Sequence, residues 1–224
     1  MKKTLLILGL AAGMAAGFQP VLAQHRKVLI YTPYGRMTIA LSDETPAYRD
    51  NFIRLVRKHF FDGLLFHRVI PHFMIQGGDP DSRHAKPGQQ LGNGDLGYTL
   101  PAAFRPDLFH RKGALAAARE GDEVNPSKAS SACQFYLVEG KTYSSAELDA
   151  VQARTGHIIP AYQRKVYETE GGTPWLDGNY TVFGQVIKGL RVIDSIASVP
   201  TDGQDRPLHD IPMRIRLKHK FLFF

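Results

Sequence analysis

The chain has 224 residues, 43% of them hydrophobic and 22% charged, with a formal net charge of +7, and it is long enough for one domain with a substantial core. Its single cysteine, Cys133, excludes an internal disulfide, and no spaced set of histidine, cysteine and carboxylate residues predicts a zinc site. The basic residues are scattered, which favours a solvated, mildly basic surface over nucleic acid binding.

Residues 1–23 have the pattern of a secretory signal peptide. Lys2 and Lys3 precede an apolar run, and Val21-Leu22-Ala23 forms a small-residue cleavage site. A transmembrane anchor is the alternative, but the uncharged run barely reaches the roughly 20 residues that a span needs, and it contains several glycines and a proline. We therefore expect export with cleavage after Ala23, giving a periplasmic or secreted protein without stable membrane insertion. Cysteine does not follow the site, which argues against lipidation.

Two β-type runs at residues 28–32 and 36–41 are separated by Pro33-Tyr34-Gly35, which predicts a hairpin. Thr45-Pro46 then predicts a helix, with threonine as N-cap and proline at the first helical position. Its apolar stripe consists of Tyr48, Phe52, Leu55, Val56 and His59. Gly63 is its expected terminator. We expect this helix to cover an opening in a sheet.

Residues 66–79 form two apolar runs joined at Pro71, with an arginine inside the first. Alternation groups the residues of each run by face, which gives Phe66, Arg68 and Ile70 in the first and Phe73, Ile75 and Gly77 in the second. A fold across Pro71 would bring Arg68 and Phe73 onto a common surface. An unpaired arginine is costly to bury. Arg68 is therefore either a structural arginine paired with a carboxylate or a functional arginine at the rim of an apolar pocket.

The remaining segments predict more short strands, separated by polar loops at residues 79–96 and 121–130. The strand-like runs are 64–69, 73–77, 113–118, 134–138, 181–187 and 211–217, and a short helix is expected at 190–197. Cys133 is expected to pack as a small hydrophobe. Many short strands with two covering helices indicate a mainly β fold, a closed antiparallel barrel without exposed edges.

Residues 141–173 predict an inserted helical hairpin near the binding groove. Ser144-x-x-Glu147 is a capping-box pattern with Gly156 as the stop, and residues 160–170 form a second amphipathic candidate. A surface elaboration is the favoured interpretation, with a role in substrate selection as the alternative. The aromatic tail at 219–224 is expected to pack on the barrel, with contact to a partner as the alternative.

Four motifs in one order resemble those of cyclophilin-type peptidyl-prolyl isomerases, here of a bacterial, exported kind. They are the run from Phe66 to Asp79, Gly113-Ala114-Leu115-Ala116-Ala117-Ala118-Arg119, Ser131-Ala132-Cys133-Gln134-Phe135-Tyr136, and the run from Trp175 to Gly184. The resemblance implies a domain over residues 27–218 with an eight-stranded closed barrel and a helix over each end. It also implies rotation about Xaa-Pro bonds, a reaction that requires no metal, cofactor or proton shuttle.

The resemblance also implies roles for individual residues. Arg68 is the matched catalytic arginine, which donates to the prolyl nitrogen, and Gln76 and Gln134 orient it and bind the substrate backbone. The proline pocket would be formed by Phe73, Met74, Tyr136 and Leu176. Ala118 and Arg119 match the strip that grips the substrate main chain, and Trp175 and Tyr180 match the rim.

Several positions depart from the family pattern. Tyr136 stands where phenylalanine is common, so its hydroxyl needs a partner or a route to water. Arg119 stands where asparagine is common and adds positive charge beside the groove. Tyr180 replaces a frequent histidine, and His67 is expected to be structural rather than a general base.

The leading hypothesis is an exported isomerase that assists folding of exported proteins. Its partners would be proline-containing polypeptides, Trp175 makes cyclosporin binding a further expectation, and we expect a monomer. A module that binds proline segments without turnover is the alternative, but it would not need Arg68. A vestigial barrel would have lost Arg68, Gln76 or Gln134, and all three are present.

Overall fold

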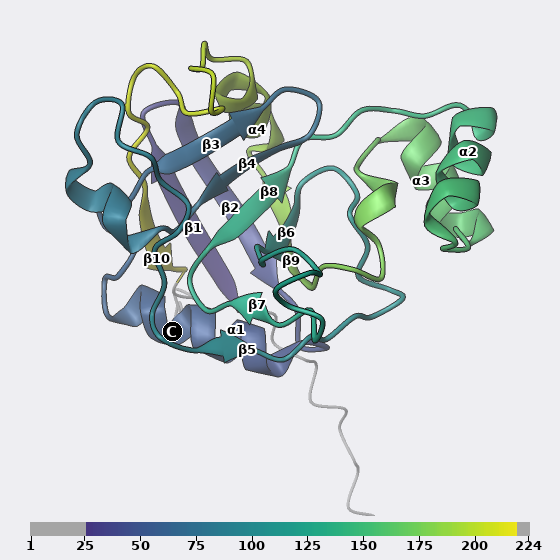
Figure 1. Cartoon of the computed structure of the whole chain (residues 1–224), viewed down its shortest axis with the longest axis horizontal. Helices are drawn as coiled ribbons and strands as arrows, with labels where there is room; N and C mark the ends of the chain where they lie inside the picture. Colours follow the sequence, from purple (N-terminus) through teal and green to yellow (C-terminus); the bar gives the residue numbers. More distant parts are fainter. Residues whose placement is uncertain (1–25, 219–224) are drawn as a thin grey trace, which may run out of the picture.

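The computed structural model of the chain describes residues 26–218 (Figure 1). The predicted signal peptide and the aromatic tail lie outside these residues. Within them, no helix is both long enough and apolar enough to cross a membrane.

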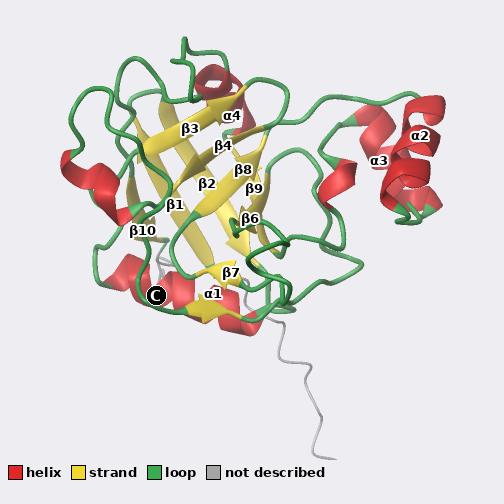
Figure 2. Ribbon diagram, in the orientation of Figure 1, coloured by secondary structure: helices red, strands yellow, loops and turns green. Residues whose placement is uncertain are grey.

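An eight-stranded antiparallel sheet curls into a half-barrel (Figure 2). In sheet order, its strands are β10 (Arg214–Leu217), β1 (Lys27–Thr32), β2 (Gly35–Leu41), β9 (Val182–Lys188), β6 (Ala114–Ala117), β8 (Phe135–Val138), β4 (Met74–Gly77) and β3 (Phe66–Ile70). All the strands predicted from the sequence are present, with ends shifted by up to three residues. Two short strands that were not predicted, β5 (Thr99–Leu100) and β7 (Ser130–Ser131), pair as a second sheet.

The prediction that the barrel is closed is not confirmed. Strands β3 and β10 are the two edges of the sheet, and they do not pair with each other as strands within residues 26–218. The chain just before each of them makes one isolated bridge, between Leu65 and Pro212, with backbone hydrogen bonds on either side. The edges therefore approach each other through irregular segments rather than a continuous ladder.

Helices α1 (Pro46–Arg57) and α4 (Leu190–Ala197) pack against the sheet, as predicted. Pro46 is at the start of α1, but the Thr45 side chain makes no capping hydrogen bond. His59 was wrongly placed on the buried stripe: α1 ends before it, its φ is positive at 55°, and its side chain is exposed. Gly63 lies too far beyond the helix to cap it.

The main core fills the space between the inner face of the sheet and these two helices. Phe52 of α1 packs on three aromatic rings, those of Phe61, Phe135 and Phe183, with centroids 4.9 to 5.6 Å apart. Cys133 is buried in this core, as predicted. A second apolar cluster covers the outer face of β4, β6 and β8, because alternate residues of these strands point outward.

The predicted helical hairpin is present as α2 (Ser145–Thr155) and α3 (Ala161–Thr169), beside the half-barrel (Figure 1). Ser144 and Glu147 form the predicted capping box, and Gly156 ends α2 with a φ of 68°. The hairpin has an apolar cluster of its own, and α2 contacts the short 3₁₀ helix η2 (Pro174–Leu176). Another 3₁₀ helix, η1 (Pro80–His84), interrupts the loop predicted at 79–96.

Candidate active site

A cavity of about 290 Å³ lies on the outer face of β3, β4 and β8. It is lined by His67, Arg68, Phe73, Met74, Gln76, Leu91, Gly92, Asn93, Ala118, Arg119, Tyr136, Leu176 and Tyr180. The cavity therefore brings together every residue predicted for the site except Gln134 and Trp175, although these residues are spread over more than 100 positions of the sequence.

The β3–β4 hairpin places two polar residues of the site, Arg68 and Gln76, next to each other. Arg68 pairs with Gln76 in the register of the two strands, and Gln76 in turn pairs with Tyr136 of β8. A β-bulge between Phe66 and Arg68 changes the alternation in β3. Phe66 therefore points into the main core, and the prediction that it shares a face with Arg68 is wrong.

The same hairpin corrects the grouping predicted for the second run. Ile75 points into the main core, whereas Phe73 precedes β4 and lies in the outer cluster with Met74. Arg68 and Phe73 nevertheless line one cavity, as the fold across the Pro71 turn predicted.

The apolar part of the cavity is made of side chains from several separate segments. Met74 and Tyr136 come from the outer face of the sheet, and Leu176 comes from η2. Trp175 does not line the cavity but packs behind Phe73, with ring centroids 5.8 Å apart. Together these side chains form an apolar surface that suits a small apolar ring.

Arg68 contacts a carboxylate rather than the glutamines predicted to orient it. Its Nε lies 3.4 Å from Oδ2 of Asp205, and the guanidinium makes no hydrogen bond to Gln76 or Gln134 within residues 26–218. The structure thus combines the two interpretations of this arginine, since Arg68 both pairs with an acid and lines an apolar cavity.

Gln76 and Gln134 instead bond to each other and hold a loop. The Gln76 amide donates to Oε1 of Gln134 at 3.0 Å, and the Gln134 amide donates to the carbonyls of Gly92 and Gly94, both at 2.8 Å. This loop supplies one wall of the cavity. The sequence did not single out its residues Leu91, Gly92 and Asn93, because they lie in a polar stretch without a periodic pattern.

Arg119 and Tyr180 form a stacked pair at the rim. The Arg119 guanidinium lies 4.4 Å from the centre of the Tyr180 ring, and its Nε donates to the carbonyl of Asn179 at 2.8 Å. Asp122 pairs with the same guanidinium at 2.6 Å. The positive charge predicted beside the groove is therefore neutralised locally. A larger depression of about 940 Å³ adjoins the cavity and shares Arg119 and Gln76 with it.

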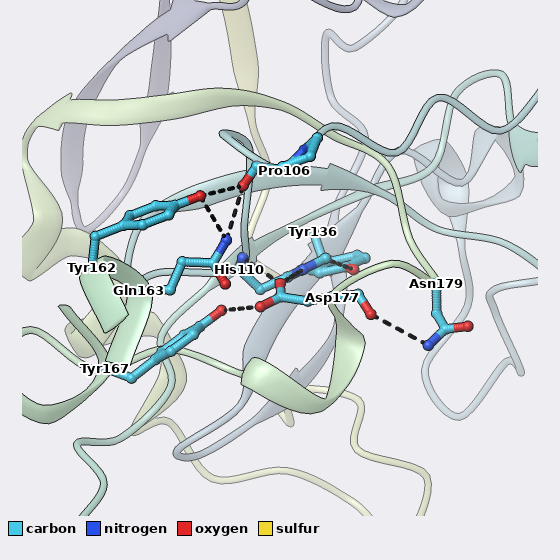
Figure 3. Close-up of polar contacts among 8 residues, drawn as sticks. All are labelled: Pro106, His110, Tyr136, Tyr162, Gln163, Tyr167, Asp177 and Asn179. Carbon is cyan, nitrogen blue, oxygen red and sulfur yellow. Dashed lines mark hydrogen bonds and ion pairs between the residues drawn. The ribbon is translucent and has the colours of Figure 1, made fainter. Parts of the chain in front are cut away.

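The Tyr136 hydroxyl has a buried partner. It lies 2.9 Å from Nε2 of His110, and His110 Nδ1 lies 2.8 Å from Oδ1 of Asp177 (Figure 3). The Tyr167 hydroxyl of α3 donates to the other oxygen of Asp177 at 2.6 Å. The sequence signalled that this hydroxyl needs a partner, but His110, Asp177 and Tyr167 were not singled out as site residues.

His67 lines the cavity with a ring that makes no hydrogen bond through either nitrogen within the described part of the chain. Burial lowers the pKa of His67 to about 4, so the ring is neutral near neutral pH. Residues 26–218 contain no group of three or more histidine, cysteine or acidic side chains placed to hold a metal ion. The site thus offers a cavity with an apolar part and a guanidinium beside it, which suits a ligand with an apolar ring next to a hydrogen-bond acceptor.

Comparisons with known proteins point to one family. The family model for cyclophilin type peptidyl-prolyl cis-trans isomerase matches residues 27–216. A putative peptidyl-prolyl cis-trans isomerase of Staphylococcus haemolyticus is 36% identical, with 83% of this chain and 87% of that protein covered. A putative bifunctional phosphatase/peptidyl-prolyl cis-trans isomerase of Streptococcus pyogenes is 37% identical, and the match spans 83% of this chain but only 37% of that protein.

Solved structures show the same fold. A cyclophilin type isomerase of Cryptosporidium parvum superposes with a TM-score of 0.62 at 23% identity, covering 88% of this chain and 99% of the other. That protein has also been crystallised in the presence of the dipeptide Ala-Pro.

Proposed function

The chain belongs to the cyclophilin-type peptidyl-prolyl cis-trans isomerases and is an enzyme of that class, and we propose that it acts on exported polypeptides with Arg68 as its catalytic residue. The cavity beside Arg68 would hold the proline ring. The observation that carries the proposal is that Arg68 and the apolar groups Phe73, Met74 and Tyr136 line one cavity.

The chemistry of the reaction explains why these groups suffice. Resonance in the amide sets a rotation barrier of roughly 18–20 kcal/mol, and uncatalysed isomerisation takes tens to hundreds of seconds. Rotation makes and breaks no covalent bond, so a catalyst needs only to bind the twisted amide more tightly than either planar form. When the amide twists, the lone pair of the prolyl nitrogen leaves conjugation and can accept a hydrogen bond.

The geometry around Arg68 suits this role. The ion pair with Asp205 uses Nε, and both terminal nitrogens of the guanidinium make no hydrogen bond within residues 26–218. A planar guanidinium held at one edge presents the remaining donors in a fixed direction, which a lysine ammonium cannot do. Gln76 and the loop held by Gln134 lie beside it, where they would bond the substrate backbone.

The test is a cis-to-trans assay on an Xaa-Pro peptide, with the chain from Gln24, its Arg68→Ala and Arg68→Lys variants, and Arg105→Ala as a matched control. Arg105 is also half-exposed and paired with one carboxylate, Glu44, but it does not line the cavity. We expect Arg68→Ala and Arg68→Lys to lower kcat/KM by roughly 100-fold or more with peptide binding retained, and Arg105→Ala to match the wild type.

Binding without acceleration in the wild type would identify a module that holds proline segments without turnover. Acceleration that survives in Arg68→Ala would leave the enzyme intact and remove Arg68 from the mechanism. These two outcomes therefore separate the activity from the residue proposed to carry it.

The proposal of export rests on residues 1–23, whose sequence has the layout of a cleaved signal peptide. The protein would act in the periplasm or outside the cell, as a monomer, on unfolded exported chains whose Xaa-Pro bonds limit their folding. N-terminal sequencing of the protein recovered from a bacterial periplasm tests this, and a mature end at Gln24 is expected. An uncleaved protein retained in the cytoplasm would contradict it. Cyclosporin binding is a further proposal, and inhibition in the same peptide assay would test it.

A further inference from the structure

A buried chain of four hydrogen-bonded side chains joins the cavity to the inserted hairpin (Figure 3). Tyr136 belongs to β8 and lines the cavity, His110 lies before β6, Asp177 follows η2, and Tyr167 belongs to α3. Each of the four residues is at most 4% exposed. Of these four residues, only Tyr136 also belongs to the substrate-binding groups described above.

The hydrogen bonds of this chain form a consistent set when the His110 ring carries its proton on Nδ1. Burial raises the pKa of Tyr136 and of Tyr167 well above the usual value for a phenol, so both remain protonated and each donates one hydrogen bond. Asp177 accepts from Tyr167, from the backbone N–H of His110 at 2.9 Å and from Nδ1–H of the same residue. His110 Nε2 is then the acceptor for the Tyr136 hydroxyl.

This order of residues resembles that of an activated nucleophile, but the geometry excludes that use. The Tyr136 hydroxyl is directed to a histidine that is 1% exposed, and not to the open cavity. What the chain fixes is the orientation of the Tyr136 ring, which also packs edge-on against Tyr180 at the rim, with centroids 6.1 Å apart. A ring that lines the cavity is thus held from behind by a hydrogen bond.

The hairpin is the far anchor of this support. Tyr167 is fully buried in the apolar cluster of the hairpin, so the position of its hydroxyl is set by how α2 and α3 pack. Asp177 receives that hydroxyl at the end of η2, the segment that carries Leu176 into the cavity. A displacement of α3 would therefore shift Asp177 and, through His110, the Tyr136 ring.

We propose that the packing of the α2–α3 hairpin sets the position of the Tyr136 ring in the isomerase cavity through these hydrogen bonds. His110, Asp177 and Tyr167 are the positioning residues. The inference rests on the proposed function, since it takes the cavity as the proline site. It gives the inserted hairpin a part in catalysis, beyond a surface elaboration.

The test is a double-mutant cycle between Tyr167→Phe and Tyr136→Phe, with kcat/KM on an Xaa-Pro peptide and the free energy of unfolding measured for each variant. Both changes remove a hydroxyl and keep the ring. Tyr162→Phe is the matched control, because Tyr162 is also a tyrosine of α3 but donates to the Pro106 carbonyl, which is not part of the four hydrogen-bonded side chains. All the variants are checked for folding by circular dichroism.

We expect Tyr167→Phe to lower kcat/KM by roughly three- to tenfold in the wild-type background and by less than about twofold in the Tyr136→Phe background. Tyr162→Phe should stay within about twofold of the wild type in both. A purely structural role for Tyr167 would lower stability but give the same loss of kcat/KM in both backgrounds.

Equal losses in the two backgrounds, or no loss beyond that of Tyr162→Phe, would overturn the proposal while leaving the isomerase assignment in place. A wild-type protein without activity would instead show that the proposed function fails. His110→Gln gives a second reading if Tyr167→Phe does not fold: its loss of kcat/KM should also shrink in the Tyr136→Phe background, and a loss of equal size would overturn the proposal.

Discussion

The guanidinium Nε of Arg68 lies 3.4 Å from the carboxylate Oδ2 of Asp205, 137 residues further along the chain. Both side chains are about two-fifths exposed, so the pair is screened by water and contributes little to the free energy of unfolding. Its effect is geometric. The Asp205 backbone carbonyl also accepts from the Val69 amide at 2.8 Å, which fixes the acid next to β3.

Asp205→Asn should lower kcat/KM by about two- to fivefold, because Arg68 would lose the charged partner that orients its fork. Asparagine tolerates the positive φ of 64° at this position, so the loop should keep its shape. Unfolding in urea should change by less than about 1 kcal/mol. Glu44→Gln, which removes the partner of Arg105, is the control and should leave the activity unchanged. Unchanged or higher activity in Asp205→Asn would contradict the orienting role.

Stability should fall at acidic pH because of His67. Its pKa is lowered by burial to about 4 in the folded chain, whereas an exposed histidine has a pKa near 6.5. The folded state keeps the ring neutral while the unfolded state takes up a proton, so the contribution is complete above about pH 6.5 and is lost as the pH falls towards 4.

The measurement is urea unfolding at about pH 7.5 and about pH 5, for the wild type and for His67→Phe. The apolar replacement breaks no hydrogen bond of the ring within residues 26–218. Between these two pH values the wild type should lose on the order of 2 kcal/mol more than the variant. An identical loss in both proteins would show that His67 is not the group responsible.

Much of the fold could be predicted from local patterns. Short β-type runs bounded by turn residues located the eight strands of the large sheet, and the capping box at Ser144 with the glycine at 156 gave the limits of α2. The site residues could be listed from the motif resemblance, but their contacts could not. The bulge beside Arg68 reverses the face of Phe66, and no local pattern in the sequence marks it.

The partners of the site residues were harder to predict than the residues themselves. Asp205 and His110 lie in irregular segments, 137 residues from Arg68 and 26 residues from Tyr136, and only the tertiary fold brings these partners together. The departure from phenylalanine at Tyr136 showed that a buried hydroxyl needs an acceptor. It could not show which of the nine histidines supplies it.

Cys133 should resist thiol reagents in the folded protein. Burial raises the pKa of its thiol to about 11, and the thiolate is the reactive form, so very little of it exists at about pH 8. Labelling with an aromatic disulfide reagent at that pH should be slow in buffer and fast in concentrated urea, which exposes the thiol. Rapid labelling of the native protein would mean that this part of the core opens readily. The same reaction followed with a proline peptide present should give an equally slow rate, because Cys133 packs in the main core and not in the cavity.

Trp175 should report occupancy of the cavity, and it is the only tryptophan in the chain. Its ring packs behind Phe73 at 5.8 Å and against Tyr143 at 6.3 Å, so it lies between the cavity and the hairpin. A proline ring seated against Phe73 displaces water near the indole, and the emission should shift to shorter wavelength and saturate as an Xaa-Pro peptide is added.

The same peptide with alanine in place of proline is the control and should give no saturable change. In Phe73→Ala the response should disappear together with most of the binding. If the emission stays constant while the peptide is demonstrably bound, the proline ring does not sit against Phe73, and the binding site lies elsewhere on the groove.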